Sequence, residues 1–585
     1  MRILGIYDDH NCGCAVIEDG RILSAIEEER LSRIKLHSGN TQDGPPVRSL
    51  REVLKQTKSD NQNIDKIAVA IAPPAELLKY VLNDLFKIQK HSKWILASMA
   101  SKSITWDRYF LMYPYFYNWS RIRRVKKLLK EFELDHLPID YVDHHTAHAA
   151  SAYYTSGRPK SLIVTLDGQG DGEGGTIFKG ENGQLEKIKS IPSYNSIGLF
   201  YNFFTWMLGF KPNRHEGKVT GLAAYGDYSK MRHHFESMFS YDGEDFSYDL
   251  AKKIFHHAYP HRTKYNKLVE VMPFEMNGHP KEHIAAGIQS LCEDLVSKFV
   301  SSIVEKTGEI DVCLAGGVFA NVRINQKVAE IDKVNSVFIF PAMGDGGLSA
   351  GAALYSYFMH DNNAEDFGTV PKIDDVYLGP EYSEKEMEAE LKNQNMKYEY
   401  FGDLPMKVAE LLADGKVIAR FNGRMEFGPR ALGNRSILYQ TTDATVNDWL
   451  NERLNRTEFM PFAPATVTEL ADDCYKNIGA NDFPAEFMTI TFDCTEEMHK
   501  KCPAVVHVDG TARPQLVDET HNPSYYRIIK EYHNLTGLKS IINTSFNMHE
   551  EPIVCSPYDA IRAFKLGHLD YLAMSNFLVY PPNDV

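Results

Sequence analysis

Two histidines and two aspartates in the N-terminal half have the residue types and the settings of metal ligands. In VDHHTAHAAS, His144 and His148 are four residues apart on an expected helix, so their side chains point the same way, whereas His145 points elsewhere. Asp167 in TLDGQGDGEGG and Asp345 in FPAMGDGGLSAGAAL each follow an expected strand. Two imidazoles and two carboxylates form a mixed nitrogen and oxygen donor set, which suits a divalent transition ion.

Each of these residues also has a structural explanation. The histidines could pack or cap a helix. Asp167 could belong to a type I′ hairpin turn with the glycine after it, and Asp345 could cap the helix that follows it. All four stand at strand ends or helix starts, and together they favour a metal site more strongly than any one of them does.

Glycine-rich segments elsewhere in this half predict a nucleotide contact. LAGGVFANVRIN ends a strand in Gly316 and Gly317 and then enters a helix. Paired glycines allow a ribose or adenosine to lie against the backbone, although close packing of helix on strand would leave the same pattern. NRHEGKVTGLAAYG places Glu216 and Lys218 in what is either an active-site loop or an ordinary turn.

Arginines gather in loops of the C-terminal half. GRMEFGPRALGNRSIL contains Arg424, Arg430 and Arg435, HVDGTARPQLV adds Arg513, and SIINTSFN ends an apolar strand in polar side chains. Guanidinium groups bind phosphate and carboxylate through paired hydrogen bonds, so these loops predict an anion site. Surface arginines and a polar turn are a poor alternative when three such segments share one domain.

The elements around these residues predict an α/β protein of two domains. MRILGIYDDHNCGCAVIEDGRILSAIEEER and SLIVTLDGQGDGEGGTIFKGENGQLEKIKSI each predict a three-stranded meander with tight turns. With the helices that follow, they indicate a duplicated actin-like fold over residues 1–358, with a helical insertion at about 75–130. The polar segment 359–372 is predicted to be a linker, and residues 373–585 a second α/β domain.

Composition narrows the function classes. A chain of 585 residues, 43% hydrophobic and 24% charged, is typical of a globular protein with more than one domain. The net charge of -14 argues against a nucleic-acid binder that relies on a general positive field. We expect a cytoplasmic protein without a membrane span, because no long uninterrupted apolar stretch occurs. Eight scattered cysteines without CxxC pairs predict neither disulfides nor a zinc ribbon.

Seven segments in one order carry a family resemblance. DHHTAHAAS, DGQGDGEGG, EGKVTGLAAYG, GPRALGNRSIL, PFAPATV, HVDGTARPQ and NTSFN resemble the O-carbamoyltransferases of the nodulation-protein and antibiotic-biosynthesis family. The resemblance covers nearly the whole chain and implies a Kae1-like (actin-fold, ASKHA) domain followed by a YrdC-like domain. It also implies that the YrdC-like domain forms carbamoyl adenylate from carbamoyl phosphate and ATP. The Kae1-like domain would then carbamoylate a hydroxyl of a small-molecule natural product.

The same resemblance implies roles for individual residues. Fe²⁺ or another divalent metal would be held by His144, His148, Asp167 and Asp345, with Mg²⁺ as a further cation. His10 and Lys218 are expected to act in catalysis. The expected nucleotide-binding residues are His10, Gln169, Gly316, Gly317 and Asn321. The expected carbamoyl-phosphate-binding residues are Arg430, Arg435, Arg456, Arg513, Asn543 and Ser545.

Three residues depart from the family pattern. Leu454 and Met460 stand where many relatives carry basic residues, so either Arg453 or Arg456 compensates, or the carbamoyl phosphate pocket is weaker. Glu550 stands where relatives usually have glycine.

Other enzyme classes stay open at this point: an actin-fold kinase or metallohydrolase, and a tRNA threonylcarbamoyl-adenosine-type enzyme. A nucleotide sensor without turnover is a further alternative. We expect no nucleic-acid partner, and a homodimer is compatible with the sequence. The sequence does not specify the acceptor, and we expect its contacts in the basic, aromatic segment 87–130 and in YPHRTKYNKLVEVMPFEMNGHP, residues 259–280.

Overall fold

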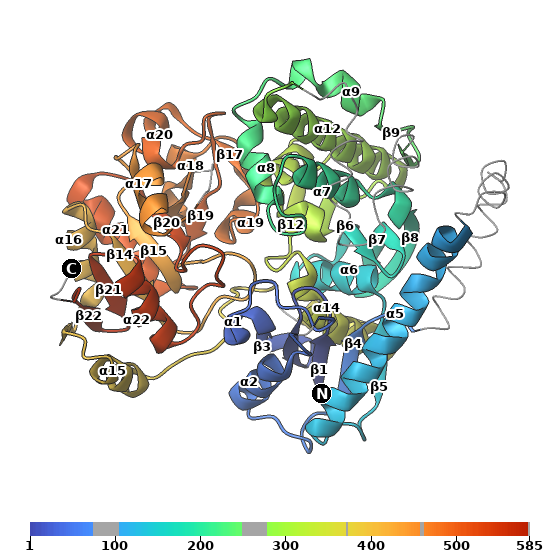
Figure 1. The fold of residues 1–585 in the computed structure, drawn as a ribbon, viewed down its shortest axis with the longest axis horizontal. Coiled ribbons are helices and arrows are strands. Elements are labelled where there is room, and N and C mark those ends of the chain that lie inside the picture. The colour runs from blue at the N-terminus through green and yellow to red at the C-terminus, as the bar shows by residue number, and fades with distance from the viewer. Residues whose placement is uncertain (42, 74–103, 249–277, 370–371, 457–460, 583–585) are drawn as a thin grey trace.

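The computed structural model describes residues 1–41, 43–73, 104–369, 372–456 and 461–582, apart from 249–277. Figure 1 shows two bodies side by side, which we call the N-terminal part (up to residue 369) and the C-terminal part (from residue 372). Among the described residues, none of the helices combines the length and apolar character that crossing a membrane requires. All eight cysteines are buried and free, as expected.

The N-terminal part contains two five-stranded sheets that pair their strands in the same order. The first has the order β3-β2-β1-β4-β5 and consists of β1 (Arg2–Tyr7), β2 (Gly13–Glu18), β3 (Arg21–Glu27), β4 (Lys66–Ala70) and β5 (Ile139–Val142). The second has the order β8-β7-β6-β11-β12 and consists of β6 (Lys160–Gly170), β7 (Glu173–Glu181), β8 (Gln184–Pro192), β11 (Asp311–Ala315) and β12 (Ser336–Ile339). In each sheet an antiparallel meander is extended by two parallel strands, so both predicted meanders are confirmed.

Helices between and outside these sheets position the candidate ligands. The inner pair, α6 (His144–Thr155) and α14 (Leu348–Tyr355), pack against each other, and α14 also packs on β1. The first turn of α6 is stabilised because the side chain of its N-cap, Asp143, accepts a hydrogen bond from the Thr146 N–H at 3.0 Å. The second sheet is flanked by α7 (Ile197–Met207), α8 (Glu216–Ala223), α12 (Lys281–Thr307) and α13 (Val322–Ala329).

The C-terminal part is built on one eight-stranded sheet of order β13-β22-β21-β14-β15-β20-β16-β19. Its strands are β13 (Tyr398–Tyr400), β14 (Ile418–Phe421), β15 (Arg435–Tyr439), β16 (Ala463–Val467), β19 (Gln515–Val517), β20 (Ser540–Ser545), β21 (Tyr571–Met574) and β22 (Phe577–Val579). The main helices are α15 (Glu384–Asn393), α16 (Leu404–Ala413), α17 (Val446–Arg453), α21 (Pro523–Thr536) and α22 (Pro557–Leu566). The candidate anion ligands lie on β15 and β20 and on loops beside the strands.

The predicted insertion and linker are described only in part. Residues 74–103 lie outside the described ones, and α5 (Ile104–Glu131) forms the rest of the expected insertion. In the predicted linker, residues Ala364–Thr369 form a 3-10 helix, and 370–371 lie outside the described residues.

The two parts meet along the loop between β14 and β15, which carries Arg424 and Arg430. The Arg30 Nη2 donates to the Gly428 carbonyl at 2.7 Å, and the Gly428 N–H donates back to the Glu27 carboxylate at 3.1 Å. Arg424 donates to the carbonyls of Leu378 and Leu23 at 2.8 and 3.0 Å. Arg424 therefore holds the parts together.

Candidate functional site

The four predicted metal ligands come together at the centre of the N-terminal part. One ligand atom from each of His144, His148, Asp167 and Asp345 lies within 4.8 Å of the other three. The Asp167 Oδ2 is 3.1 Å from the His144 Nε2 and 3.3 Å from the His148 Nε2. The Asp345 Oδ1 is 3.5 and 3.6 Å from the same two nitrogens.

Backbone elements from both sheets bring these ligands together. The histidines form the start of α6, Asp167 lies near the end of β6, and Asp345 begins the short turn that leads into α14. Glycines leave room for this approach: a Cβ at Gly170 would lie 2.1 Å from the His144 ring, and one at Gly317 would lie 2.8 Å from the Asp167 Oδ1.

Electrostatic attraction between the imidazoles and the carboxylates of the cluster shifts the pKa values of His144 and Asp167. Burial alone would lower the pKa of His144, but the carboxylates of Asp345 and Asp167 outweigh it and raise that pKa to about 9. Burial would raise the pKa of Asp167, yet hydrogen bonds with the two histidines hold it well below its usual range. Two imidazole nitrogens with two carboxylate oxygens at this spacing fit a divalent transition ion, and a cation would replace the protons that now hold the cluster together.

The structural alternatives for the two aspartates do not describe what is observed. The type I′ turn is made by Asp171 and Gly172, with φ of 51° and 92°, and not by Asp167. The side chain of Asp345 caps no helix, because the N-cap of α14 is Gly347. His145, as predicted, points away, and its ring bonds the Thr165 hydroxyl at 2.9 Å.

Of the predicted nucleotide-binding residues, His10 and Gly317 lie next to residues of the cluster. The His10 Nδ1 is 4.0 Å from the Asp345 Oδ2, and its side chain is 40% exposed. Gln169 is exposed at the end of β6. Gly316 and Gly317 follow β11, and the Asn321 side chain caps α13 and donates to the Gln289 Oε1 at 2.8 Å.

Lys218 lies on α8, one turn from its start, with a buried side chain. Glu216 begins the same helix, and burial raises its pKa while the nearby His10 opposes that rise. The sequence alone allows either an active-site loop or an ordinary turn for the segment that carries Glu216 and Lys218. This segment forms the start of α8, where Glu216 is close enough to His10 for an electrostatic interaction.

The C-terminal part contains a pair of partly buried arginines, Arg430 and Arg513. Neither Arg430 nor Arg513 has a hydrogen bond or ion pair with any residue that the structure describes, and the Nε of each is fully enclosed. Burial lowers the pKa of Arg430 to about 10. Burial and the charge of Arg430 together lower the pKa of Arg513 well below its usual range. Two partly buried cations that repel each other are an arrangement that favours the binding of an anion.

A buried glutamate shapes the loop that carries Arg430. The Glu426 Oε1 accepts hydrogen bonds from the N–H groups of Leu432, Asn434 and Arg435, at 2.8, 2.7 and 3.0 Å. Arg435 is placed differently from Arg430. Its guanidinium donates to four backbone carbonyls and stacks on the Phe421 ring at 3.8 Å. The guanidinium of Arg435 therefore stabilises the conformation of the loop.

The other predicted anion ligands lie along β20. The Asn543 amide nitrogen donates to the Gln515 Oε1 at 2.6 Å, while its oxygen is buried without a partner among the described residues. The Arg456 Nη2 donates to the Ser545 carbonyl at 2.6 Å and to the Asn547 Oδ1 at 2.9 Å.

The departures from the family pattern now have positions. Arg453 stacks on the Trp449 ring at 4.8 Å, so Arg456, and not Arg453, reaches the strand that bears Ser545. Leu454 is buried, and Met460 lies outside the described residues.

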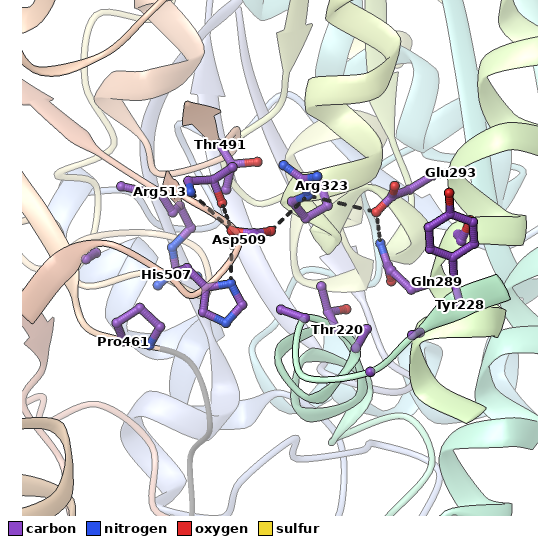
Figure 2. A pocket seen from close by; sticks show the side chains of 18 of the residues that line it. Thr220, Tyr228, Gln289, Glu293, Arg323, Pro461, Thr491, His507, Asp509 and Arg513 are labelled. Carbon is purple, nitrogen blue, oxygen red and sulfur yellow. Dashed lines mark hydrogen bonds and ion pairs between the residues drawn. The ribbon is translucent and has the colours of Figure 1, made fainter. Parts of the chain in front are cut away.

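A cavity of about 330 Å³ lies between the two parts, lined by α8, α12 and α13 and by residues 505–513. Figure 2 shows a row of polar side chains across it. The Gln289 Nε2 donates to the Glu293 Oε1 at 2.7 Å, and the Arg323 Nε lies 3.9 Å from Glu293 and 3.7 Å from the Asp509 carboxylate. Arg513 also lines this cavity.

Arg513 of this cavity is a predicted anion ligand, whereas Gln289, Glu293 and Arg323 were not predicted from the sequence, although signals existed. Gln289 and Glu293 are four apart on one helix, and Arg323 stands inside the quoted segment LAGGVFANVRIN. Tyr7, which donates to the Asp345 Oδ2 at 3.0 Å, gave no signal because it looks like an ordinary strand residue.

Comparisons with known proteins assign the family. Residues 2–354 match the family model described as carbamoyltransferase N-terminus, and residues 409–580 match carbamoyltransferase C-terminus. Uncharacterized protein MJ1058 of Methanocaldococcus jannaschii is 32% identical over 633 residues, which cover 99% of each chain. Nodulation protein NolNO of Sinorhizobium fredii is 33% identical over 583 residues, 97% of this chain and 79% of the relative.

A solved structure, HypF of T. kodakarensis, is 12% identical and covers 63% of this chain and 49% of that chain at a TM-score of 0.36, a likeness too low to carry an argument. The family models and the relatives are sufficient without it. The chain belongs to the carbamoyltransferase family and is an enzyme of that class. The resemblance drawn from its motifs is thereby confirmed.

Proposed function

We propose that this enzyme is an ATP-dependent O-carbamoyltransferase that works in two steps at two sites. Residues 373–585 act as a YrdC-like domain that forms carbamoyl adenylate, and residues 1–358 act as a Kae1-like domain that transfers the carbamoyl group, with 359–372 as the linker. The Arg430 and Arg513 pair carries the proposal, because two partly buried guanidiniums with no acidic partner among the described residues are stabilised by a bound anion.

The first step activates the carbamoyl group. Carbamoyl phosphate and water give carbamate and phosphate, and a carbamate oxygen then attacks the α-phosphorus of ATP, with Mg²⁺ accompanying the nucleotide. Pyrophosphate leaves, and carbamoyl adenylate remains. Arg430 and Arg513 bind the phosphate group, Arg456, Asn543 and Ser545 complete the pocket, and Arg435 supports it by fixing the loop.

The second step transfers the carbamoyl group to a hydroxyl of a small-molecule natural product. The acceptor oxygen attacks the carbamoyl carbon, the bond from that carbon to the AMP oxygen breaks, and AMP leaves with the bonding electrons. His10 takes the acceptor proton. Gln169, Gly316, Gly317 and Asn321 bind the adenylate, and Lys218 supplies positive charge for the leaving AMP.

The His-Asp cluster supports this step as the place for a metal. When held by His144, His148, Asp167 and Asp345, Fe²⁺ or another divalent ion would add positive charge near the adenylate phosphate. The cavity between the parts is lined by Arg513 at one side and by Gln289, the partner of Asn321, at the other. Its position suits an intermediate that is made in one part and used in the other.

The direct test is pyrophosphate release from ATP by the purified protein, with and without carbamoyl phosphate and with no acceptor. We expect pyrophosphate only when carbamoyl phosphate is present, and none from an Arg513→Ala variant. Formation of ADP, or pyrophosphate release indifferent to carbamoyl phosphate, would contradict the proposal and favour a kinase or a sensor.

A further inference from the structure

Glu550 has an unusual backbone conformation. It lies in segment 547–553, which follows β20, and its φ is 61°, in the left-handed region that favours glycine. A residue with a charged side chain is retained in such a conformation when that side chain makes compensating contacts. The contacts of Glu550 therefore indicate why this position is not glycine.

The carboxylate of Glu550 crosses to the N-terminal part and meets three basic groups. It lies 2.7 Å from the Lys211 Nζ, 3.0 Å from the Arg214 Nη2 and 2.8 Å from the His215 Nε2. The Lys211 N–H donates to the His215 Nδ1, so the neutral ring carries its proton on Nε2 and donates to Glu550. Burial opposes ionisation, but these partners lower the pKa of Glu550 to about 2.

The three basic residues belong to the loop 209–215, which joins α7 to α8. This loop is braced against the start of α8: the Asn213 N–H donates to the Glu216 Oε1 at 2.7 Å, and the Lys218 N–H donates to the His215 carbonyl at 2.9 Å. The position of loop 209–215 therefore fixes the start of α8, where Glu216 is close enough to His10 for an electrostatic interaction, and the His10 Nδ1 lies 4.0 Å from the Asp345 Oδ2.

The other end of segment 547–553 is tied to the proposed carbamoyl phosphate pocket. The Arg456 Nη2 bonds the Asn547 carbonyl at 2.8 Å as well as the Ser545 carbonyl at 2.6 Å. The Asn547 Nδ2 in turn donates to the Glu551 carbonyl at 2.9 Å, which closes the segment on itself. An anion that orders Arg456 and Ser545 thus orders the backbone that carries Glu550.

We propose that Glu550 is a positioning residue that links the C-terminal anion pocket to loop 209–215 and thereby to the start of α8. Carbamoyl phosphate in the pocket orders segment 547–553, and the ion pairs of Glu550 pass that order to the loop before the transfer step. The inference rests on the proposed function, because it requires carbamoyl phosphate to bind in the C-terminal part.

Hydrogen exchange of peptides covering residues 209–218, measured with and without carbamoyl phosphate, tests the link. In the wild type, carbamoyl phosphate should slow exchange in these peptides by roughly tenfold, a local stabilisation typical of ordering a loop. Glu550→Gln keeps a side chain at positive φ but removes the charge, and Glu550→Gly removes both. Both variants should lose the ligand-dependent protection while still releasing pyrophosphate when carbamoyl phosphate is present.

Glu551→Gln is the matched control, because Glu551 pairs with Arg562 at 2.6 Å inside the C-terminal part and should keep the protection. Protection that persists in Glu550→Gln, or that is missing in a wild type shown to bind carbamoyl phosphate, would overturn the link. Exchange that is faster in Glu550→Gln by the same factor with and without carbamoyl phosphate would also overturn the link, because it indicates a purely structural role for Glu550. A wild type that releases no pyrophosphate contradicts the proposed function instead.

Discussion

The His-Asp cluster and the arginine pair handle charge in opposite ways. In the cluster, imidazoles and carboxylates satisfy one another, and the shifted pKa values of His144 and Asp167 express that attraction. In the arginine pair, Arg430 and Arg513 repel each other, and no described residue compensates them. The His-Asp cluster therefore costs the folded protein little stability. The repulsion between the two arginines lowers the stability, and a bound anion restores it.

Removing one member of the arginine pair should have the largest effect on binding. We expect Arg513→Ala to weaken carbamoyl phosphate binding by roughly 100-fold, since hydrogen bonds to a charged group contribute about 1.5–3 kcal/mol each. The same substitution should leave the thermal midpoint unchanged or raise it, because it removes a partly buried cation that no described residue compensates. Calorimetric titration and thermal denaturation measure the two quantities, and a large drop in midpoint would show that Arg513 has a structural partner.

Removing a histidine of the cluster should strongly reduce metal binding. His148→Ala should reduce the bound metal, measured by elemental analysis of the purified protein, by at least about tenfold, as expected when a ligand is lost from a four-residue site. His145→Gln is the control, because His145 bonds Thr165 and does not face the cluster. Equal metal content in His148→Ala and wild type would remove the cluster from the account.

Arg435 sharpens the contrast within one loop. Arg435→Ala should lower the free energy of unfolding by about 3 kcal/mol, because it leaves backbone carbonyls buried without donors. Chemical denaturation of Arg435→Ala beside Arg513→Ala should therefore give effects of different size. Similar values for the two would mean that the arginines of this part do not divide into structural and binding roles.

The smallest effect concerns pH and Glu550. The ion pairs lower its pKa from the ordinary 4.5 to about 2, so its contribution to stability is complete above pH 4.5 and is lost as the pH falls toward 2. The midpoint difference between wild type and Glu550→Gln should be constant near neutral pH and should shrink in acid, and the underlying effect is about 1 kcal/mol or less. A difference that grows in acid would have the wrong sign for this cause.

Much of this could be predicted from local patterns, and the failures have physical reasons. Turn chemistry and alternation predicted both meanders, and spacing on one helix predicted which way His144 and His148 point. In TLDGQGDGEGG the sequence could not say which Asp-Gly forms the turn. In the three-dimensional structure Asp171 forms the turn, and the side chain of Asp167 contacts His144 in the cluster.

Long-range contacts were beyond the sequence. Arg430 and Arg435 look alike in the sequence GPRALGNRSIL. Only the fold shows that Arg435 donates hydrogen bonds to backbone carbonyls, whereas Arg430 donates none to the described residues. Glu550 was visible as a departure from glycine, but its reason lies in Lys211 and His215, which are more than 300 residues away.

One measurement tests the division of labour most directly: pyrophosphate release that depends on carbamoyl phosphate, compared in Arg513→Ala and His148→Ala. The account predicts that His148→Ala retains it, because adenylation belongs to the arginine pocket, and that Arg513→Ala loses it. Equal loss in both variants, or loss in His148→Ala with retention in Arg513→Ala, would contradict two separate sites with these roles.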